Sequence, residues 1–183
     1  MKKRFSLLLC AAFCLSVCAE VNYQVIPLPQ QISLDNSGKY VVLSEGMKIG
    51  YPADNAQMQR NAEFAAEYFG LTTTTDKKGA DITLALGLKS SNPDDYAISI
   101  NKKGIMIQGA SESGVFYGIQ TLRKSIMNET GEIRLPYAWV CGSPRFAYRG
   151  TMLDCARHFF PVAFTSKRQP WSSVRCQWKR LMP

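Results

Sequence analysis

The stretch YRGTMLDCARHFFP, residues 148–161, decides the fold expected for the later part of this chain. An apolar run, residues 151–153, stops at Asp154, and Arg157 and His158 follow shortly after it. A buried strand that delivers charged groups at its C-terminal end has this pattern, and in a β/α barrel that end is the mouth of the active site. On spacing alone, an ordinary strand end with surface charges explains the pattern better than a site does.

The same stretch resembles the first barrel strand of glycoside hydrolase family 20, the β-N-acetylhexosaminidases. The family pattern is an Arg-Gly pair, three apolar residues, an Asp, two small residues, and an Arg-His pair followed by two aromatic or apolar residues. The matching residues here are Arg149, Gly150, Asp154, Arg157, His158, Phe159 and Phe160. A second stretch, GVFYGIQTL at residues 114–122, is similar to the helix of the small α/β domain that precedes the barrel, although other hexosaminidase-like families share that motif.

The resemblance implies a retaining hydrolysis in which no protein carboxylate attacks the sugar. The N-acetyl oxygen of the substrate attacks the anomeric carbon, an Asp orients the acetamido group, and the adjacent Glu serves as acid and then as base. That Asp-Glu pair is absent from this sequence, so we predict no catalytic residue in the chain. Arg157 matches the family position that binds hydroxyls of the terminal sugar; an ion pair with Asp154 is its structural alternative. Asp154 and His158 are expected to shape the site or support the strand.

The substrates implied by the resemblance are glycans that end in N-acetylglucosamine or N-acetylgalactosamine, and no cofactor is implied. Cys155 lies next to Asp154, but no His–Asn pair accompanies it, so a nucleophilic role is not expected. The single histidine of the chain makes a His-rich metal site unexpected as well.

The family pattern stops at Phe164. An amphipathic helix, a His-Trp-His strand and the Asp-Glu pair should follow, and residues 165–183 (TSKRQPWSSVRCQWKRLMP) contain none of them. A frameshift or truncation accounts for this abrupt change, and we expect the short chain to be inactive as a glycosidase. The alternative is a secreted, non-catalytic carbohydrate-contacting or interaction module whose basic tail, with Trp171 and Trp178, docks to a partner.

Residues 1–19 have the pattern of a secretory signal. A basic start, residues 2–4, precedes an apolar region at residues 5–17 that is too short to span a membrane, and small residues allow cleavage after Ala19. The alternative is a lipoprotein signal with Cys18 lipidated. We therefore expect an exported protein that is periplasmic, attached to the cell surface or secreted.

The charge distribution argues against nucleic acid as a partner. The formal net charge is +8, and it resides entirely in the three basic residues of the signal and the five of the tail. A surface built for nucleic acid would not confine its basic excess to two chain ends. Three of the six cysteines lie in the signal, and the remaining three, Cys141, Cys155 and Cys176, do not suggest a disulfide framework.

Hydrophobic periodicity and turn residues predict an α+β domain with helices on one face of a sheet. Asp54 or Asn55 is expected to cap a helix that runs to Phe69, with Gly70 just past its end. The elements expected are strands within residues 38–49, a helix at 55–69, a strand at 81–88, a hairpin at 96–109 that turns at 101–104, a helix at 111–126 and a strand at 132–140.

Four segments follow from these observations: a signal at residues 1–19, the α+β domain at 20–143, the first strand of an incomplete TIM barrel at 144–164, and an unrelated basic tail at 165–183. Gly114 and Gly118 lie four residues apart in the second helix. Because glycine costs about 1 kcal/mol of helix propensity relative to alanine, such positions usually allow close backbone packing. A phosphate cradle is the alternative, but no Gly-rich loop follows a strand here.

Overall fold

The computed structural model describes residues 18–19, 21–76, 78–126, 132–146 and 148. The chain divides into two compact units, residues 1–144 and residues 145–183. All of the described helices and strands belong to the first unit. The expected barrel strand and the basic tail lie outside the described residues.

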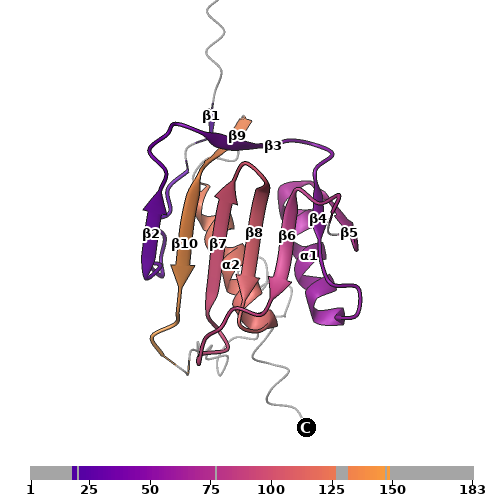
Figure 1. Ribbon diagram of the computed structural model, residues 1–183, viewed down its shortest axis with the longest axis vertical. Helices are drawn as coiled ribbons and strands as arrows, with labels where there is room; N and C mark the ends of the chain where they lie inside the picture. Colours follow the sequence, from indigo (N-terminus) through magenta and orange to yellow (C-terminus); the bar gives the residue numbers. More distant parts are fainter. Residues whose placement is uncertain (1–17, 20, 77, 127–131, 147, 149–183) are drawn as a thin grey trace, which may run out of the picture. The chain divides into compact units, whose positions relative to one another are not determined.

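A seven-stranded mixed sheet forms the body of the first unit, in the order β2-β10-β7-β8-β6-β4-β5 (Figure 1). Its strands are antiparallel from β2 to β8 and parallel from β8 to β5. A second sheet has the order β1-β9-β3. The strands are β1 Cys18–Ala19, β2 Gln31–Leu34, β3 Tyr40–Leu43, β4 Lys48–Gly50, β5 Thr72–Thr74, β6 Ile82–Leu86, β7 Tyr96–Asn101, β8 Gly104–Gly109, β9 Glu132–Pro136 and β10 Ala138–Gly142.

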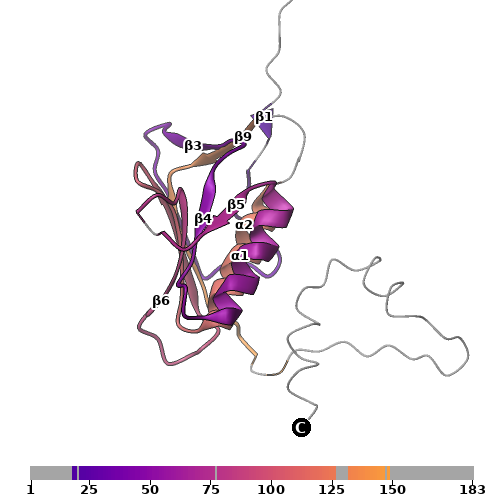
Figure 2. The ribbon, with the colours of Figure 1, turned by 90° about the vertical axis from the view of Figure 1, so that its right-hand side faces the viewer.

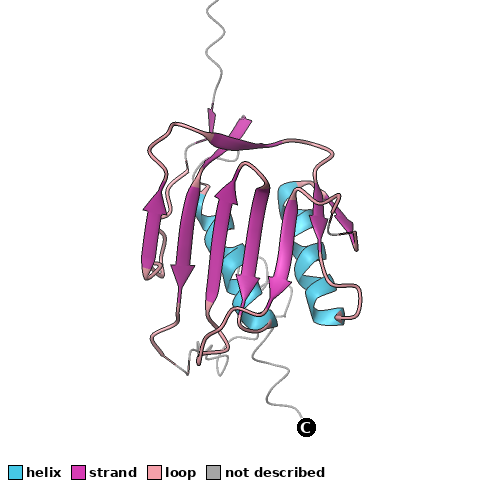
Figure 3. Ribbon diagram, viewed as in Figure 1, coloured by secondary structure: helices cyan, strands magenta, loops and turns pink. Residues whose placement is uncertain are grey.

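Two helices, α1 (Ala56–Phe69) and α2 (Glu112–Ser125), lie side by side on one face of the large sheet, as Figure 2 shows. The other face carries no helix among the described residues (Figure 3). Helices segregated to one face of a sheet define the α+β class, so the predicted fold class of this domain is confirmed.

Both ends of α1 lie where the sequence predicted them. The side-chain oxygen of Asn55 accepts hydrogen bonds from the backbone N–H groups of Gln57 and Met58, each 3.0 Å long. These bonds satisfy two of the helix's unpaired N-terminal donors. At the other end Gly70 has φ +67°, and its N–H donates to the carbonyl of Ala66. Glycine adopts this left-handed conformation without the steric cost that a side chain adds.

The hairpin between β7 and β8 also matches its prediction. Gly104 begins the return strand with φ +113°, and the backbone N–H of Lys103 donates to the side chain of Asn101 at 2.8 Å. A β-carbon at Gly104 would lie 2.3 Å from the carbonyl oxygen of Asp81, which immediately precedes the neighbouring strand β6. Glycine is therefore required there by both conformation and space.

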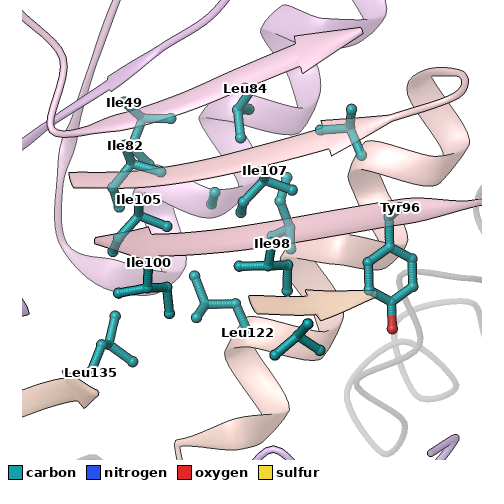
Figure 4. Close-up of a cluster of buried hydrophobic side chains, with 14 of the residues drawn as sticks. Ile49, Ile82, Leu84, Tyr96, Ile98, Ile100, Ile105, Ile107, Leu122 and Leu135 are labelled. Atoms are coloured by element: carbon teal, nitrogen blue, oxygen red, sulfur yellow. The ribbon is translucent and has the colours of Figure 1, made fainter. Parts of the chain in front are cut away.

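The core lies between the helices and the covered face of the sheet (Figure 4). Alternate residues of the central strands point toward the helices, as the two-residue period of a strand requires. From α2, Val115, Ile119 and Leu122 pack against them, and from α1, Met58 and Ala62 do so. The strand side chains that are almost fully buried in this layer are Ile49, Ile82, Leu84, Ile98, Ile100, Ile105, Ile107, Leu135 and Val140.

The prediction of a single strand at residues 132–140 is wrong. The chain breaks there into β9 and β10, which belong to different sheets. Tyr137 marks the break: its N–H donates to the carbonyl of Lys39, and its own carbonyl accepts from the N–H of Asp35. Pro136 has no N–H with which to continue a ladder. Leu135, fully buried, keeps β9 against the core.

The short strands β1, β2 and β5 were not predicted. β1 falls within the expected signal and pairs in parallel with β9. β2 and β5 form the two edges of the large sheet. Strands of two to four residues are too short for a recognisable hydrophobic period, and their positions depend on pairing with distant segments.

Candidate functional site

The first unit ends at Pro144, and a loop at residues 90–95 lies against that end. The side-chain N–H of Asn92 donates to Ser143 Oγ at 3.1 Å and to the Pro144 carbonyl at 3.5 Å. On its other side the loop accepts a hydrogen bond of 2.6 Å from Ser111, the N-cap of α2, at the carbonyl of Pro93. The start of α2 and the last residues of the domain are thus tied to one loop.

Asp95 is one of the two acidic residues of this loop. Its Oδ2 accepts a hydrogen bond from the hydroxyl of Ser90, while Oδ1 is buried without a partner among the described residues. Its backbone carbonyl accepts from the N–H of Ala110 at 3.0 Å, which holds the loop against the turn between β8 and α2. A carboxylate that accepts from a serine of its own loop and is held by its backbone in this way organises the loop.

Cys141 lies on the neighbouring strand β10. Burial raises the pKa of its thiol, the negative charge of Asp95 raises that pKa further, and a hydrogen bond with the backbone of Gln31 partly offsets both. The thiol therefore stays protonated at neutral pH. Because the thiolate is the reactive form, Cys141 is not suited to nucleophilic chemistry.

Tyr96 joins three elements beside this loop. Its hydroxyl shares a hydrogen bond of 2.6 Å with that of Thr121 on α2. Burial raises the pKa of the phenol, and the bond to Thr121 moderates the rise. On β10, a β-carbon at Gly142 would lie 2.4 Å from the Tyr96 hydroxyl. The phenol is thus a neutral structural group enclosed between β7, α2 and β10.

Gly114 and Gly118 serve packing. A β-carbon at Gly114 would lie 2.2 Å from the carbonyl oxygen of Asp95, and one at Gly118 would lie 2.6 Å from a methyl group of Ile107. Both positions are therefore filled by the protein itself, which leaves no space for a phosphate group. Close packing, the first explanation of this motif, is confirmed: Gly114 lies against the backbone of Asp95, and Gly118 lies against the side chain of Ile107.

A shallow hollow of about 280 Å³ lies beside β3 and β9. The guanidinium of Arg134 lies 5.1 Å from the ring centre of Tyr40 and forms an ion pair of 2.8 Å with Glu132. Asp35 and Lys39 also line the hollow, so it carries charges of both signs. No group of three His, Cys, Asp or Glu side chains that could hold a metal ion occurs in the part of the chain that the structure describes.

The residues predicted for the sugar site lie outside the described residues. Arg157, its alternative partner Asp154, and His158 are among these, and so is Cys155. The sequence reasoning did not single out the loop at residues 90–95, although its Asn-Pro-Asp-Asp run is a recognisable turn signal. Within residues 18–19, 21–76, 78–126, 132–146 and 148, no described helix is long and apolar enough to cross a membrane.

The domain from Asn22 to Val140 matches a family model described as "Glycosyl hydrolase family 20, domain 2". The matched residues extend from the start of the described domain through most of β10 and include the helix with Gly114 and Gly118. The chain belongs to glycosyl hydrolase family 20. The resemblance noted in the sequence is thereby confirmed, because the match covers well over half of the chain.

Several relatives of this family 20 chain carry the name β-hexosaminidase. A β-hexosaminidase of Porphyromonas gingivalis is 27% identical over 184 residues, which cover 86% of this chain and 23% of that protein. One of Vibrio furnissii is 36% identical over 67 residues, which cover 37% of this chain and 11% of that protein. The chain thus spans less than a quarter of the length of each of these two relatives.

Solved structures of β-N-acetylhexosaminidases share the fold of this domain. That of Streptomyces plicatus N-acetyl-β-hexosaminidase in complex with Thio-NAglucal has a TM-score of 0.68 at 25% identity, covering 76% of this chain and 30% of that one. The β-N-acetylhexosaminidase of Bacteroides fragilis has a TM-score of 0.67 at 18% identity, covering 80% and 30% of the respective chains.

Proposed function

We propose that this chain is the N-terminal part of an exported β-N-acetylhexosaminidase, which removes terminal N-acetylglucosamine or N-acetylgalactosamine from the non-reducing ends of glycans. The observation that carries the proposal is the family match across residues 22–140, together with relatives named β-hexosaminidases. In this proposal the described domain supports the enzyme and performs no step of the reaction. Its potentially reactive groups fit that role, since Cys141 and Tyr96 are held in their neutral forms.

The reaction proposed is substrate-assisted and retaining, as is characteristic of the family. The acetamido oxygen of the sugar attacks the anomeric carbon, and an Asp-Glu pair supplies orientation and proton transfer. This sequence lacks that pair, so the chain by itself is proposed to be inactive. Arg157 would bind ring hydroxyls through the fixed donors of its guanidinium.

Export is the second part of the proposal. Cleavage after Ala19 would leave Glu20 as the first residue, and lipidation would instead retain Cys18. The two routes differ in whether β1, Cys18–Ala19, stays in the domain. The mass of the N-terminal peptide from protein isolated from its native cells distinguishes them. A peptide that begins at Met1 would contradict export by either route.

Hydrolysis is tested in two parallel assays with a chromogenic N-acetyl-β-glucosaminide. In the first, the purified chain is expected to release no chromophore above background. In the second, residues 22–144 replace the corresponding domain of the Porphyromonas gingivalis β-hexosaminidase, and that hybrid is expected to hydrolyse the substrate. Hydrolysis by the chain alone would show that the described domain or its neighbouring residues carry chemistry. A folded hybrid without activity would show that this domain does not support a family 20 enzyme.

A further inference from the structure

The uncovered face of the large sheet carries an exposed tryptophan on β10, the strand next to the edge strand β2. In the view of Figure 3 both helices lie behind the sheet, and this face is turned toward the reader. Trp139 of β10 points to this side because its neighbours Ala138 and Val140 are buried in the core. It remains 41% exposed, although large aromatic side chains usually bury most of their surface.

The strand register places hydroxyl groups on both sides of the indole. Trp139 is opposite Ser33 of β2 and also opposite Ser99 of β7. Beyond Ser99, in the same row, lies Met106 of β8, which is 46% exposed. Since neighbouring strands lie about 4.8 Å apart, Trp139 and Met106 are separated by about 10 Å. In this part of the row, the large apolar side chains of Trp139 and Met106 therefore alternate with serine hydroxyl groups.

No ionisable side chain interrupts this row. From β2 to β5 it consists of Ser33, Trp139, Ser99, Met106, Thr83, Gly50 and Thr74. The next row, on the same face, consists of Gln31, Cys141, Ala97, Gln108 and Ala85. These two rows are therefore uncharged and polar, with two large apolar side chains, whereas Lys48, next to the buried Ile49 on β4, lies on the same face outside them.

We propose that this face binds an uncharged glycan chain, with one pyranose ring stacked on Trp139 and a neighbouring sugar over Met106. One side of a pyranose presents C–H groups that pack on an aromatic ring, while its rim presents hydroxyls to Ser33 and Ser99. The absence of charge on the row matches a neutral polymer. The choice of an N-acetylglucosamine polymer as its ligand rests on the proposed function.

Other occupants fit this face less well. Nucleic acid requires cationic side chains to neutralise phosphates, and anionic membrane surfaces attract them too, but the two rows contain none. A stable protein interface has a continuous apolar centre of substantial area. Here Trp139 and Met106 are separated by Ser99, so the apolar surface is divided into two small patches.

The test measures binding of the full purified chain to the N-acetylglucosamine hexasaccharide by calorimetry. Trp139→Ala should weaken binding about tenfold or more, which corresponds to about 1.4 kcal/mol. Trp139→Phe should retain most of the affinity, because a stacking ring remains. Met106→Ala should weaken binding of the hexasaccharide more than binding of the disaccharide. The hyaluronan hexasaccharide, which carries carboxylates on alternate sugars, serves as the charged comparison and should bind more weakly.

Tyr40→Ala is the matched control, because Tyr40 is also 46% exposed but lies on β3 of the other sheet. It should leave binding unchanged, and circular dichroism should show that every variant is folded. No binding by the unaltered chain, or equal loss in the Trp139 and Tyr40 variants, would overturn the proposal. A shift of the unaltered chain to a dimer that Trp139→Ala abolishes would also overturn it, in favour of self-association. Free sugar released in the calorimeter cell would instead count against the proposed inactivity of the chain.

Discussion

At the scale of single residues, Gly114 is the position where one added carbon atom should cost most. Alanine there would gain about 1 kcal/mol of helix propensity but would place its β-carbon against the carbonyl of Asp95, at 2.2 Å. We expect Gly114→Ala to lower the free energy of unfolding by about 1–3 kcal/mol, as overpacking does elsewhere. Urea denaturation measures this. Glu67→Ala, on the exposed side of α1, is the control and should change stability by less than about 0.5 kcal/mol. Equal effects of the two variants would mean that the domain relaxes freely around α2.

The buried hydroxyl pair Tyr96–Thr121 gives a second prediction. Tyr96→Phe leaves the Thr121 hydroxyl buried without its partner, so the free energy of unfolding should fall by about 1–2 kcal/mol. Removing both hydroxyls, with Thr121→Val added, should recover part of that loss, because no unpaired polar group then remains. The measurement is a double-mutant cycle in urea. Additive losses would show that the two hydroxyls stabilise the fold independently.

Buried tyrosines also predict an alkaline limit to stability. Burial raises the pKa of Tyr23 and of Tyr96 above the ordinary value of 10.0. Well below pH 10 both phenols are protonated in the folded and in the unfolded protein. Their contribution to the free energy of unfolding is therefore complete at pH 8. As the pH rises through 10, the unfolded chain ionises first, and the free energy of unfolding should fall. Tyr23→Phe, which removes a buried hydroxyl without a described partner, should make this decline shallower. An unchanged slope in that variant would exclude Tyr23 as the cause.

At the scale of elements, Asn55 joins the N-termini of the two helices. Its Oδ1 caps α1, and its Nδ2 donates to Glu112 of α2 at 2.7 Å, which lowers the pKa of that carboxyl. Asn55→Ala should cost about 1–2 kcal/mol. Asn55→Asp keeps a cap but removes the donor to Glu112 and places a second carboxylate beside it, so the pKa of Glu112 should rise.

The pH dependence of stability distinguishes the bond from Asn55 to Glu112 from the role of Asn55 as the cap of α1. A carboxyl whose pKa is lowered by folding stabilises the protein above its unfolded pKa, and that stability is lost as the pH falls. In the unaltered protein the loss should occur below the ordinary value of 4.5. NMR titration of Glu112 provides the measurement. A pKa that is identical in the unaltered protein and in Asn55→Asp would show that the bond between the helices has no electrostatic effect.

The elements that the sequence predicted correctly are those fixed by nearby residues. Asn55 and Gly70 bound α1, and Gly104 closes the β7–β8 hairpin, all within a few residues of the structure they determine. The division between β9 and β10 was missed, because Tyr137 bonds to Lys39 and Asp35, far away along the chain. No local pattern contains that information. Likewise, alternation in β10 places Trp139 opposite the core side, but only the register with β2 and β7 shows its hydroxyl neighbours.

For the candidate sugar site, the motif at residues 148–161 carried the family assignment but not the geometry. Arg157 lies outside the described residues, and its role stays a prediction. In the described domain, the loop at residues 90–95 contacts Ser143 and Pro144. A turn could be expected from that loop's sequence, but its contact with the end of the domain depends on how the sheet is assembled.

At the scale of the whole molecule, the first unit should fold without the second. Its core is built from residues of α1, α2 and the sheet, all before residue 145. A chain of residues 20–144 is expected to unfold cooperatively in urea and to show dispersed amide signals by NMR. Matched spectra of the 183-residue chain provide the comparison. A non-cooperative transition in the shorter chain would mean that residues beyond 144 are needed for the fold.

The place of β10 in the sheet has a consequence for the order in which the domain forms during synthesis. It is the last strand of the domain along the chain, yet it lies between β2, which is made early, and β7. Until β10 emerges from the ribosome, β2 lacks its neighbour in the sheet and one edge of β7 stays open. Contacts between such distant segments slow folding, because a long loop must close before they form. The nascent chain should therefore stay incompletely folded until almost all of the domain has been made, which is the condition that a translocation channel for unfolded polypeptides requires.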